Sequence, residues 1–295
     1  MELIPFDDRD GLIWLNGELV AWRDAKTHTL SHGLHYASLV FEGERAYGGI
    51  IFAGAEHTKR LRTSCKMLDF DIPMSNEEVD AAKRAVLAAN NIKDGYVRAF
   101  CWRGSEMMAI SAQQTKTHVA IAAWEWPSYF DPETKMRGIT LDIAKWKRPS
   151  PESAPVHAKA AGLYMICTLS KHEAEKKGFQ DALMLDYRGY VAEATGANVF
   201  FIDEGGTLHT PIPDCFLNGI TRQTVIRLAE SLQMKVVERH LKPEELDAMR
   251  ECFLTGTAAE VTPVARIGDY SFTPSDACRQ LVTAYDDLVN GRLTL

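Results

Sequence analysis

The chain has 295 residues, of which 46% are hydrophobic and 25% are charged, with 20 glycines and 12 prolines. This usage is ordinary for a globular protein and excludes collagen-like, low-complexity and wholly disordered chains. At roughly 100–200 residues per domain, the length predicts two domains or one large one. A formal net charge of −7 and the lack of any block of five like charges disfavour nucleic-acid binding, which usually needs a basic face.

The sequence also favours a cytoplasmic location. Its apolar runs are shorter than the ~18 residues of a transmembrane helix, and its acidic start, MELIPFDDRD, is unlike a basic signal peptide. The six cysteines are scattered and form no CxxC pair, so they predict neither a zinc site nor a disulfide scaffold. We expect reduced, mostly buried thiols.

The first half has the pattern of an α+β domain. Asn16-Gly17 predicts a hairpin between two strands in 12–21, and Ser75 with Glu78 forms a capping box at a helix start. The further elements expected are a histidine-containing loop at 27–35, strands at 39–41 and 45–47, helices over 56–69 and 75–90, and buried strands at 95–100 and 118–124.

The second half alternates helices and strands after two proline-containing segments. Residues 127–137 carry two prolines and four charges and form our candidate linker, and residues 148–156 predict an irregular loop. The elements expected are helices over 163–177, 221–233 and from about Ser275, a short helix from Pro243, and strands at 181–186, 190–192, 198–203, 235–239 and 252–255. We therefore predict an α/β (α+β) protein with a small N-terminal domain (1–127), a linker (128–137) and a larger C-terminal domain (138–295).

Lys159 is the first candidate for chemistry. Its neighbours in HAKAAGLY are small, so a bulky planar group could approach the backbone. An apolar setting favours a neutral, nucleophilic amine. The alternative is a lysine at a helix start with its head in water.

Two segments could bind a phosphate. Asn218-Gly219-Ile220-Thr221-Arg222 opens an amphipathic helix, whose free N–H groups and dipole favour an anion. Thr255-Gly256-Thr257-Ala258 follows a strand and brings two hydroxyls around a glycine. An ordinary helix cap and a simple turn are the alternatives.

Two further groups could bind charged parts of a ligand. Glu193, among small residues in AEATGAN, could pair with a buried cation, or could be an exposed turn acid. Tyr96 and Arg98 share one face of a strand and suit a carboxylate, unless Arg98 makes a structural salt bridge. We expect no metal site, because His32 and His35 have no accompanying ligand motif, and no serine hydrolase site, because GxSxG is absent.

One ligand with its substrate would use all five of these candidate groups. The ligand would carry a phosphate, a pyridine nitrogen and an aldehyde, and the substrate would carry a carboxylate. In the order and spacing of its motifs, the chain resembles the branched-chain amino-acid aminotransferases, which are fold-type IV enzymes dependent on pyridoxal 5'-phosphate. The motifs are NGELV (16–20), SHGLHY (31–36), EHTKRL (56–61), YVR (96–98), KAAGLY (159–164), GYVAEATGANVF (189–200), LNGITR (217–222) and GTAAEVTPV (256–264).

The resemblance implies two α/β domains with the cofactor at the domain interface. It implies that Lys159 binds the cofactor as an internal aldimine and moves the α-proton, that Glu193 faces the pyridine nitrogen, and that Tyr164 bonds the phenolic oxygen. The implied phosphate and ring contacts come from Arg60, Leu217, Gly219, Ile220, Thr221 and Thr257. The implied substrate contacts come from Tyr36 of a partner subunit, Phe41, Tyr96, Arg98, Trp126, Tyr129, Gly196, Thr257 and Ala258.

The implied activity is ping-pong transamination of L-leucine, L-isoleucine or L-valine with 2-oxoglutarate, passing through pyridoxamine phosphate. The partners are small amino acids and 2-oxo acids, without nucleic acid or membrane, in a homodimer or a trimer of dimers. The chain departs from the family pattern in the loop 102–110, at Glu44 and at Ala197. Alternatives within the fold are a D-amino-acid or (R)-amine aminotransferase and an aminodeoxychorismate lyase, and outside it a non-catalytic carrier.

Overall fold

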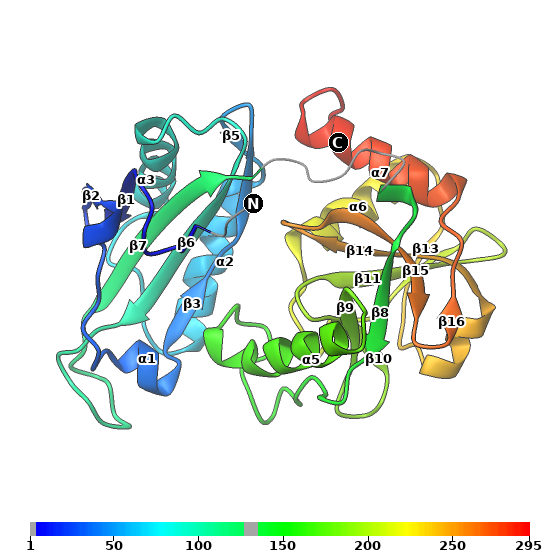
Figure 1. Cartoon of the computed structure of the whole chain (residues 1–295), viewed down its shortest axis with the longest axis horizontal. Coiled ribbons are helices and arrows are strands. Elements are labelled where there is room, and N and C mark those ends of the chain that lie inside the picture. Colours follow the sequence, from blue (N-terminus) through cyan, green and yellow to red (C-terminus); the bar gives the residue numbers. More distant parts are fainter. Residues whose placement is uncertain (1–3, 127–134) are drawn as a thin grey trace. The chain divides into compact units, whose positions relative to one another are not determined.

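The computed structural model describes residues 4–126 and 135–295, which form two compact units (Figure 1). The first unit contains residues 4–126 and Ala158–Gly162, and the second contains residues 135–157 and Leu163–Leu295. Ala158–Gly162 joins the first unit because its backbone bonds there: Lys159 N–H donates to Ser64 Oγ (3.0 Å), and Phe41 N–H donates to the Lys159 carbonyl (3.1 Å). The domains expected from the sequence, 1–127 and 138–295 with a linker at 128–137, stay a prediction.

The first unit is built on an antiparallel sheet. In residues 4–126 the strand order is β2-β1-β7-β6-β4-β5, and β3 also pairs with β6. The strands are β1 (Leu12–Leu15), β2 (Glu18–Ala21), β3 (Leu39–Phe41), β4 (Glu44–Tyr47), β5 (Ile50–Ile51), β6 (Gly95–Arg103) and β7 (Thr117–Glu125). Asn16 and Gly17 both have positive φ, as the predicted two-residue hairpin turn requires.

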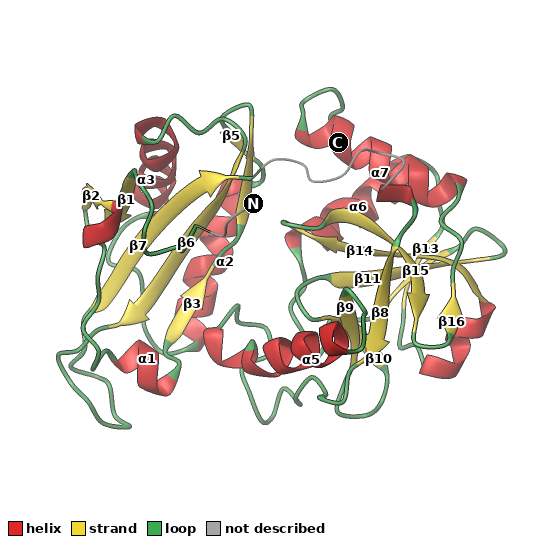
Figure 2. Cartoon of the chain, viewed as in Figure 1, coloured by secondary structure: helices red, strands yellow, loops and turns green. Residues whose placement is uncertain are grey.

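Two long helices pack on this sheet and on each other: α2 (Gly54–Met67) and α3 (Asn76–Ala89) (Figure 2). The predicted capping box begins α3, because Ser75 Oγ accepts from Glu78 N–H and Glu78 Oε2 accepts from Ser75 N–H. Within the segment 27–35, expected to be a loop, a short helix α1 (His32–Tyr36) begins; a 3₁₀ turn, η1 (Trp22–Asp24), precedes it.

The second unit contains a closed ring of strands. In residues 135–295 the order is β10-β9-β8-β15-β14-β11-β12-β13, and a further β10–β11 pairing closes six of the strands into a small barrel. The strands are β8 (Ile139–Ile143), β9 (Asp181–Leu185), β10 (Val191–Ala194), β11 (Asn198–Asp203), β12 (Leu208–Thr210), β13 (Val236–Glu238), β14 (Met249–Gly256), β15 (Glu260–Ile267) and β16 (Tyr270–Ser271).

Three helices pack against these strands. α5 (Met165–Lys176) contacts β8 and β9, whereas α6 (Ile220–Ser231) and α7 (Asp276–Val289) contact each other and the strands β14 and β15 (Figure 1). The remaining short elements are the 3₁₀ turns η2 (Ala161–Leu163) and η3 (Pro243–Ala248). Buried side chains such as Leu141, Val199, Phe201 and Val264 form an apolar core on these strands.

The sequence missed two strands of this barrel. β15 contains Pro263, a residue that lacks the N–H of a sheet ladder and usually argues against a strand. β8 follows the proposed linker and joins β9 and β15 in parallel, a pairing between segments far apart in the chain. In the described part of the chain, no helix is long and apolar enough to cross a membrane.

Candidate active site

Lys159 lies beside Phe41 in the first unit. A bridge between Val40 and Ala160 brings the lysine segment alongside β3, and the Lys159 ammonium nitrogen lies 5.0 Å from the centre of the Phe41 ring. The backbone N–H of Lys159 is fixed by Ser64, one turn after Arg60 on α2. Lys159 is partly buried among these neighbours.

Tyr96 and Arg98 project from the same face of β6 toward Phe41. The Arg98 guanidinium lies 4.7 Å from the Phe41 ring centre, and its Nη2 donates to the Tyr96 hydroxyl at 3.3 Å. Tyr96 also contacts the Trp126 ring, with 5.6 Å between ring centres. Gly43 admits the tyrosine hydroxyl, because a Cβ there would lie 1.8 Å from it.

The salt-bridge alternative for Arg98 is not what the structure shows. Within residues 4–126 and 135–295, no carboxylate lies within 4.0 Å of its guanidinium, and its buried Nε has no hydrogen-bond partner there. A half-buried guanidinium that bonds only a phenol retains donors for a carboxylate ligand.

Arg60 is fixed by a residue that the sequence did not suggest. Its Nε and Nη2 donate to the two oxygens of Glu42, each at 2.7 Å, and His57 Nδ1 donates to the same carboxylate at 2.7 Å. Glu42 is fully buried; although burial raises its pKa, the Arg60 charge and the bonds from both donors outweigh this and hold the pKa well below the ordinary value. The sequence offered one signal for this role of Glu42: its carboxylate directly follows the apolar run Leu39-Val40-Phe41. A charged group buried next to such a run needs a partner of opposite charge.

Two expected substrate residues are not part of this cluster. Tyr36 lies in α1, is 44% exposed, and stacks on His32 with ring centres 4.5 Å apart. Tyr129 lies outside the described residues.

Glu193 lies in β10 of the second unit, buried and paired, and is not an exposed turn acid. Arg148 Nε lies 3.3 Å from its Oε1, and Asn198 Nδ2 donates to its Oε2 at 3.2 Å. Burial lowers the pKa of the Arg148 guanidinium, but the Glu193 carboxylate, with smaller contributions from Cys167 and Tyr164, outweighs burial and raises the pKa overall. A cation at one carboxylate oxygen and an amide donor at the other are an arrangement that favours the ionised form of a carboxyl group.

Arg148 also fixes the segment that carries Tyr164. Its Nη1 donates to the Leu163 carbonyl and contacts Cys167 Sγ, each at 3.3 Å, while Tyr164 itself is the N-cap of α5. Neither Arg148 nor Asn198 was a sequence candidate. In the sequence, both are merely polar residues next to expected buried strands, and this alone does not indicate a functional role.

The predicted phosphate segment begins α6 as expected. Gly219 is the N-cap and provides no side chain to cap the helix, so Ile220 and Thr221 start a twelve-residue helix whose first N–H groups suit an anion. Asn198 Nδ2 donates to the carbonyl of Leu217 (3.0 Å), which fixes this turn.

The second phosphate candidate follows β14. Gly256 lies against the β10–β11 turn, since a Cβ added there would lie 3.4 Å from both the Gly196 carbonyl oxygen and the Ala197 Cβ. Thr257 is partly buried and Ala258 is exposed. The neighbouring Thr255 hydroxyl is buried, and among the described residues it has no hydrogen-bond partner.

These residues fit pyridoxal phosphate. An uncapped helix start and an arginine suit its phosphate, a buried carboxylate suits its ring nitrogen, and a lysine suits its aldehyde. Among the described residues, two buried donors have no hydrogen-bond partner: Arg98 Nε in the first unit and the Thr255 hydroxyl in the second. The first unit carries Arg60, Arg98 and Lys159, and the second carries Glu193, Gly219 and Thr255. Each of these two sets is described within its own unit.

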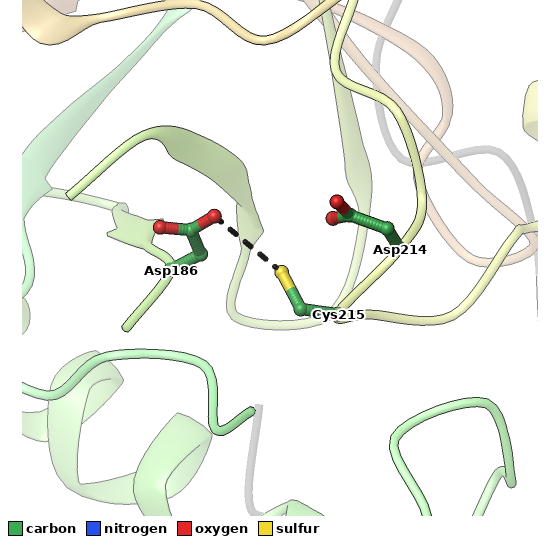
Figure 3. Close-up of side chains that lie close together, drawn as sticks. All are labelled: Asp186, Asp214 and Cys215. Atoms are coloured by element: carbon green, nitrogen blue, oxygen red, sulfur yellow. Dashed lines mark hydrogen bonds between the residues drawn. The ribbon is translucent and has the colours of Figure 1, made fainter. Parts of the chain in front are cut away.

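A separate cluster could suggest a cation site. One ligand atom from each of Asp186, Asp214 and Cys215 lies within 4.8 Å of the others (Figure 3). However, Arg188 Nη2 bonds both carboxylates, at 2.7 Å to Asp186 and 2.9 Å to Asp214, so a guanidinium already balances their charge. Burial and the two carboxylates raise the pKa of the Cys215 thiol to about 12, which makes it a poor metal ligand.

The chain belongs to the class IV aminotransferase family, whose model matches residues 39–267. It is 41% identical over 292 residues to the branched-chain-amino-acid aminotransferase of Pseudomonas aeruginosa, covering 97% of this chain and 95% of that protein. It is 44% identical over 267 residues to a probable branched-chain-amino-acid aminotransferase of Rickettsia felis, covering 90% of each. The family expected from the sequence is therefore confirmed.

Solved structures agree with this assignment. The branched-chain amino acid aminotransferase of Escherichia coli superposes with a TM-score of 0.92 at 35% identity, covering 97% of this chain and 97% of that one. The corresponding enzyme of Thermobaculum terrenum, in its PLP-bound holo-form, gives 0.88 at 30% identity, covering 96% of this chain and 95% of that one. The α/β fold expected from the sequence is confirmed.

Proposed function

We propose that this protein transfers the amino group between branched-chain L-amino acids and 2-oxoglutarate, using pyridoxal 5'-phosphate. One observation carries the substrate side of the proposal: the Arg98 guanidinium lies on the Phe41 ring, bonds Tyr96, and has no carboxylate partner in the described chain. An apolar ring and a cation on one surface suit leucine, isoleucine or valine in one half-reaction and glutamate in the other. The similarity to enzymes of that name supports this assignment.

When bound, pyridoxal phosphate supplies an aldehyde carbon and an electron-withdrawing ring. Lys159 would hold the cofactor through its aldehyde carbon, and the same Nζ, when it is free of the cofactor, would accept and return the proton of the substrate α-carbon. Glu193, held by Arg148 and Asn198, accepts a hydrogen bond from the ring nitrogen. Tyr164 donates to the phenolic oxygen.

The local geometry of each segment supports the proposed phosphate and carboxylate contacts. Arg60, the amides of Ile220 and Thr221, and the Thr257 hydroxyl bind the phosphate, while Gly219 leaves the helix start open. Leu217 packs on the ring. The substrate residues are Phe41, Tyr96, Arg98, Trp126, Tyr129, Gly196 and the Thr257-Ala258 amides, with Tyr36 contributed by a second subunit.

A homodimer accounts for the apolar surface around α1. Leu34, Leu30 and Tyr36 are 62%, 51% and 44% exposed, and Leu34 lines a cavity of about 210 Å³ with Trp102 and Phe100. Exposed apolar groups of this kind mark a contact surface. Sedimentation should show a dimer or a trimer of dimers, and Leu34→Asp should dissociate it. A cytoplasmic location stays a prediction.

The test is a substrate panel on the purified holoenzyme. We expect visible cofactor absorbance and conversion of L-leucine, L-isoleucine and L-valine with 2-oxoglutarate. Lys159→Ala should lose the activity while keeping its fold. Turnover of D-alanine or an (R)-aryl amine in place of L-leucine would overturn the substrate assignment.

A further inference from the structure

Asn198 occupies the first position of β11, between two strands that carry candidate site residues. It pairs with Glu193 of β10 and with Thr255 of β14, so these three side chains form one row on the same face of the sheet. The Asn198 side chain is 4% exposed.

The Asn198 carboxamide uses both of its protons and one oxygen lone pair. Its Nδ2 donates to Glu193 Oε2 (3.2 Å) and to the Leu217 carbonyl (3.0 Å), while its Oδ1 accepts from Gly219 N–H (3.1 Å). Only a side-chain amide offers two donors and an acceptor from one planar group. Aspartate would lose both donors, and alanine would lose all three bonds.

The contact with Asn198 also explains the glycine at the start of α6. Gly219 has φ −62° and ψ 140°, which any residue adopts, so backbone conformation does not require glycine there. A Cβ at this position would instead lie 2.3 Å from Asn198 Oδ1. The amide and the helix start are therefore fitted closely to one another.

We propose that Asn198 is a positioning residue that fixes the carboxylate for the cofactor ring nitrogen relative to the phosphate-binding start of α6. This inference rests on the proposed function, since it assigns those two roles to Glu193 and to Ile220-Thr221. One carboxamide bonds both groups, so the spacing between the two anchors of the cofactor is set within the second unit itself.

Arg148 and Asn198 play different parts in holding Glu193. Arg148 places a positive charge beside Oε1, whereas the neutral amide of Asn198 bonds Oε2 and links it to the loop 217–219. Loss of Asn198 should leave the Arg148 pair of Glu193 in place but remove the bond that ties Oε2 to the loop 217–219, and it should loosen the helix start at the same time.

The experiment measures cofactor binding to the apoenzyme by absorbance titration, with pyridoxal phosphate and with pyridoxal, which lacks the phosphate. Wild type must bind pyridoxal phosphate, and failure here would overturn the proposed function itself. We expect Asn198→Ala and Asn198→Asp to weaken pyridoxal phosphate binding about ten- to a hundredfold, since each loses a bond to a charged group. With ¹⁵N-labelled cofactor, the ring-nitrogen resonance should also shift in both variants.

Asn90 provides a matched control. Its carboxamide, like that of Asn198, makes three hydrogen bonds, but all three are to backbone. It donates to the carbonyls of Leu12 and Val86 and accepts from Leu12 N–H. Asn90→Ala should lower the melting temperature without changing cofactor affinity or the ¹⁵N resonance. If the Asn198 variants behave in the same way, Asn198 is structural only and the proposal is wrong.

Gly219→Ala leaves Asn198 in place and therefore covers the case in which Asn198→Ala does not fold. Gly219→Ala should weaken pyridoxal phosphate binding more than pyridoxal binding, because the added methyl group displaces the phosphate-binding turn against Asn198 Oδ1. In Asn198→Ala, where that oxygen is gone, the same change should add little. Equal losses for the two ligands in Gly219→Ala would contradict the proposed coupling.

Discussion

The carboxylate of Glu42 holds the guanidinium of Arg60 in a two-pronged ion pair, with Nε–Oε1 and Nη2–Oε2 both at 2.7 Å. This geometry orients the planar guanidinium as well as pairing its charge. His57 donates a third hydrogen bond to the same carboxylate, which has no exposed surface. Glu42 therefore determines where the proposed phosphate ligand of α2 points.

The first prediction is a pH-dependent stabilisation by Glu42. Its folded-state pKa lies below the ordinary 4.5, because Arg60 and the hydrogen bonds overcome the effect of burial. The ionised carboxylate thus stabilises the fold at neutral pH, and this contribution is lost as the pH falls below about 5 toward the folded pKa. Glu42→Gln should cost about 3–5 kcal/mol at pH 7, and the difference from wild type should be about 1 kcal/mol smaller at pH 4.

Urea unfolding at fixed protein concentration measures this difference. Glu18→Gln, at an exposed position of β2, is the control and should follow wild type at both pH values. A Glu42→Gln deficit that stays constant between pH 7 and pH 4 would show that Glu42 is not the titrating group.

The second prediction concerns Glu44, the first residue of β4. Glu44 pairs with Lys83 of α3, with Nζ–Oε1 at 2.8 Å and both side chains at most 1% exposed. Lys83 also donates to Thr58 Oγ1 (2.6 Å) and to the Gly54 carbonyl (3.3 Å), so the pair connects β4 with both long helices. Lys83→Met alone should cost about 3–5 kcal/mol, because it leaves a buried charge unpaired.

A double change tests the origin of that cost. Glu44→Leu with Lys83→Met removes both charges, and its free energy of unfolding should recover most of the loss. An additive loss in the double variant would mean that packing, and not the unpaired carboxylate, accounts for the cost of Lys83→Met. Chemical denaturation of wild type, Lys83→Met, Glu44→Leu and the double variant gives the four free energies of unfolding that the cycle compares.

These two carboxylates also show where sequence-based prediction ends. Local signals predicted the elements well: Asn16-Gly17 gave the hairpin turn, and Ser75 with Glu78 gave the start of α3. The partners of Glu42 and Glu44 lie on α2 and α3, and no local signal links those helices to the segment 42–44, where β3 leads into β4. The same holds for Asn198, which meets Leu217 and Gly219 only after the barrel has formed. The roles of the site residues stay predictions, whereas the family is established.

The third prediction is that native thiols are unreactive. All six cysteines are free and buried, as the sequence suggested. Burial raises the pKa of Cys167 to about 11, with Arg148 opposing the shift, and burial together with Glu251 raises that of Cys278 to about 12. Since thiolate is the reactive form, a thiol reagent at pH 8 should label less than one cysteine per native chain within minutes, and six in denaturant. Rapid labelling of a single thiol in the native protein would contradict this burial.

The fourth prediction assigns the choice between substrates to Arg98. Its guanidinium meets the Phe41 ring at 4.7 Å and donates to Tyr96 at 3.3 Å. Arg98→Leu keeps an apolar surface but removes the cation, so kcat/KM for L-glutamate should fall about ten- to a hundredfold. The value for L-leucine should change much less, because its side chain offers no charge to Arg98.

Single-turnover absorbance changes measure the two half-reactions separately. Arg84→Leu removes an exposed arginine of α3 and should leave both rates unchanged. Tyr96→Phe removes the hydroxyl that accepts from Arg98 but keeps the cation, so it should retain most of the preference for glutamate. Equal losses for glutamate and leucine in Arg98→Leu would mean that Arg98 supports the shape of β6 and does not recognise the side-chain carboxylate.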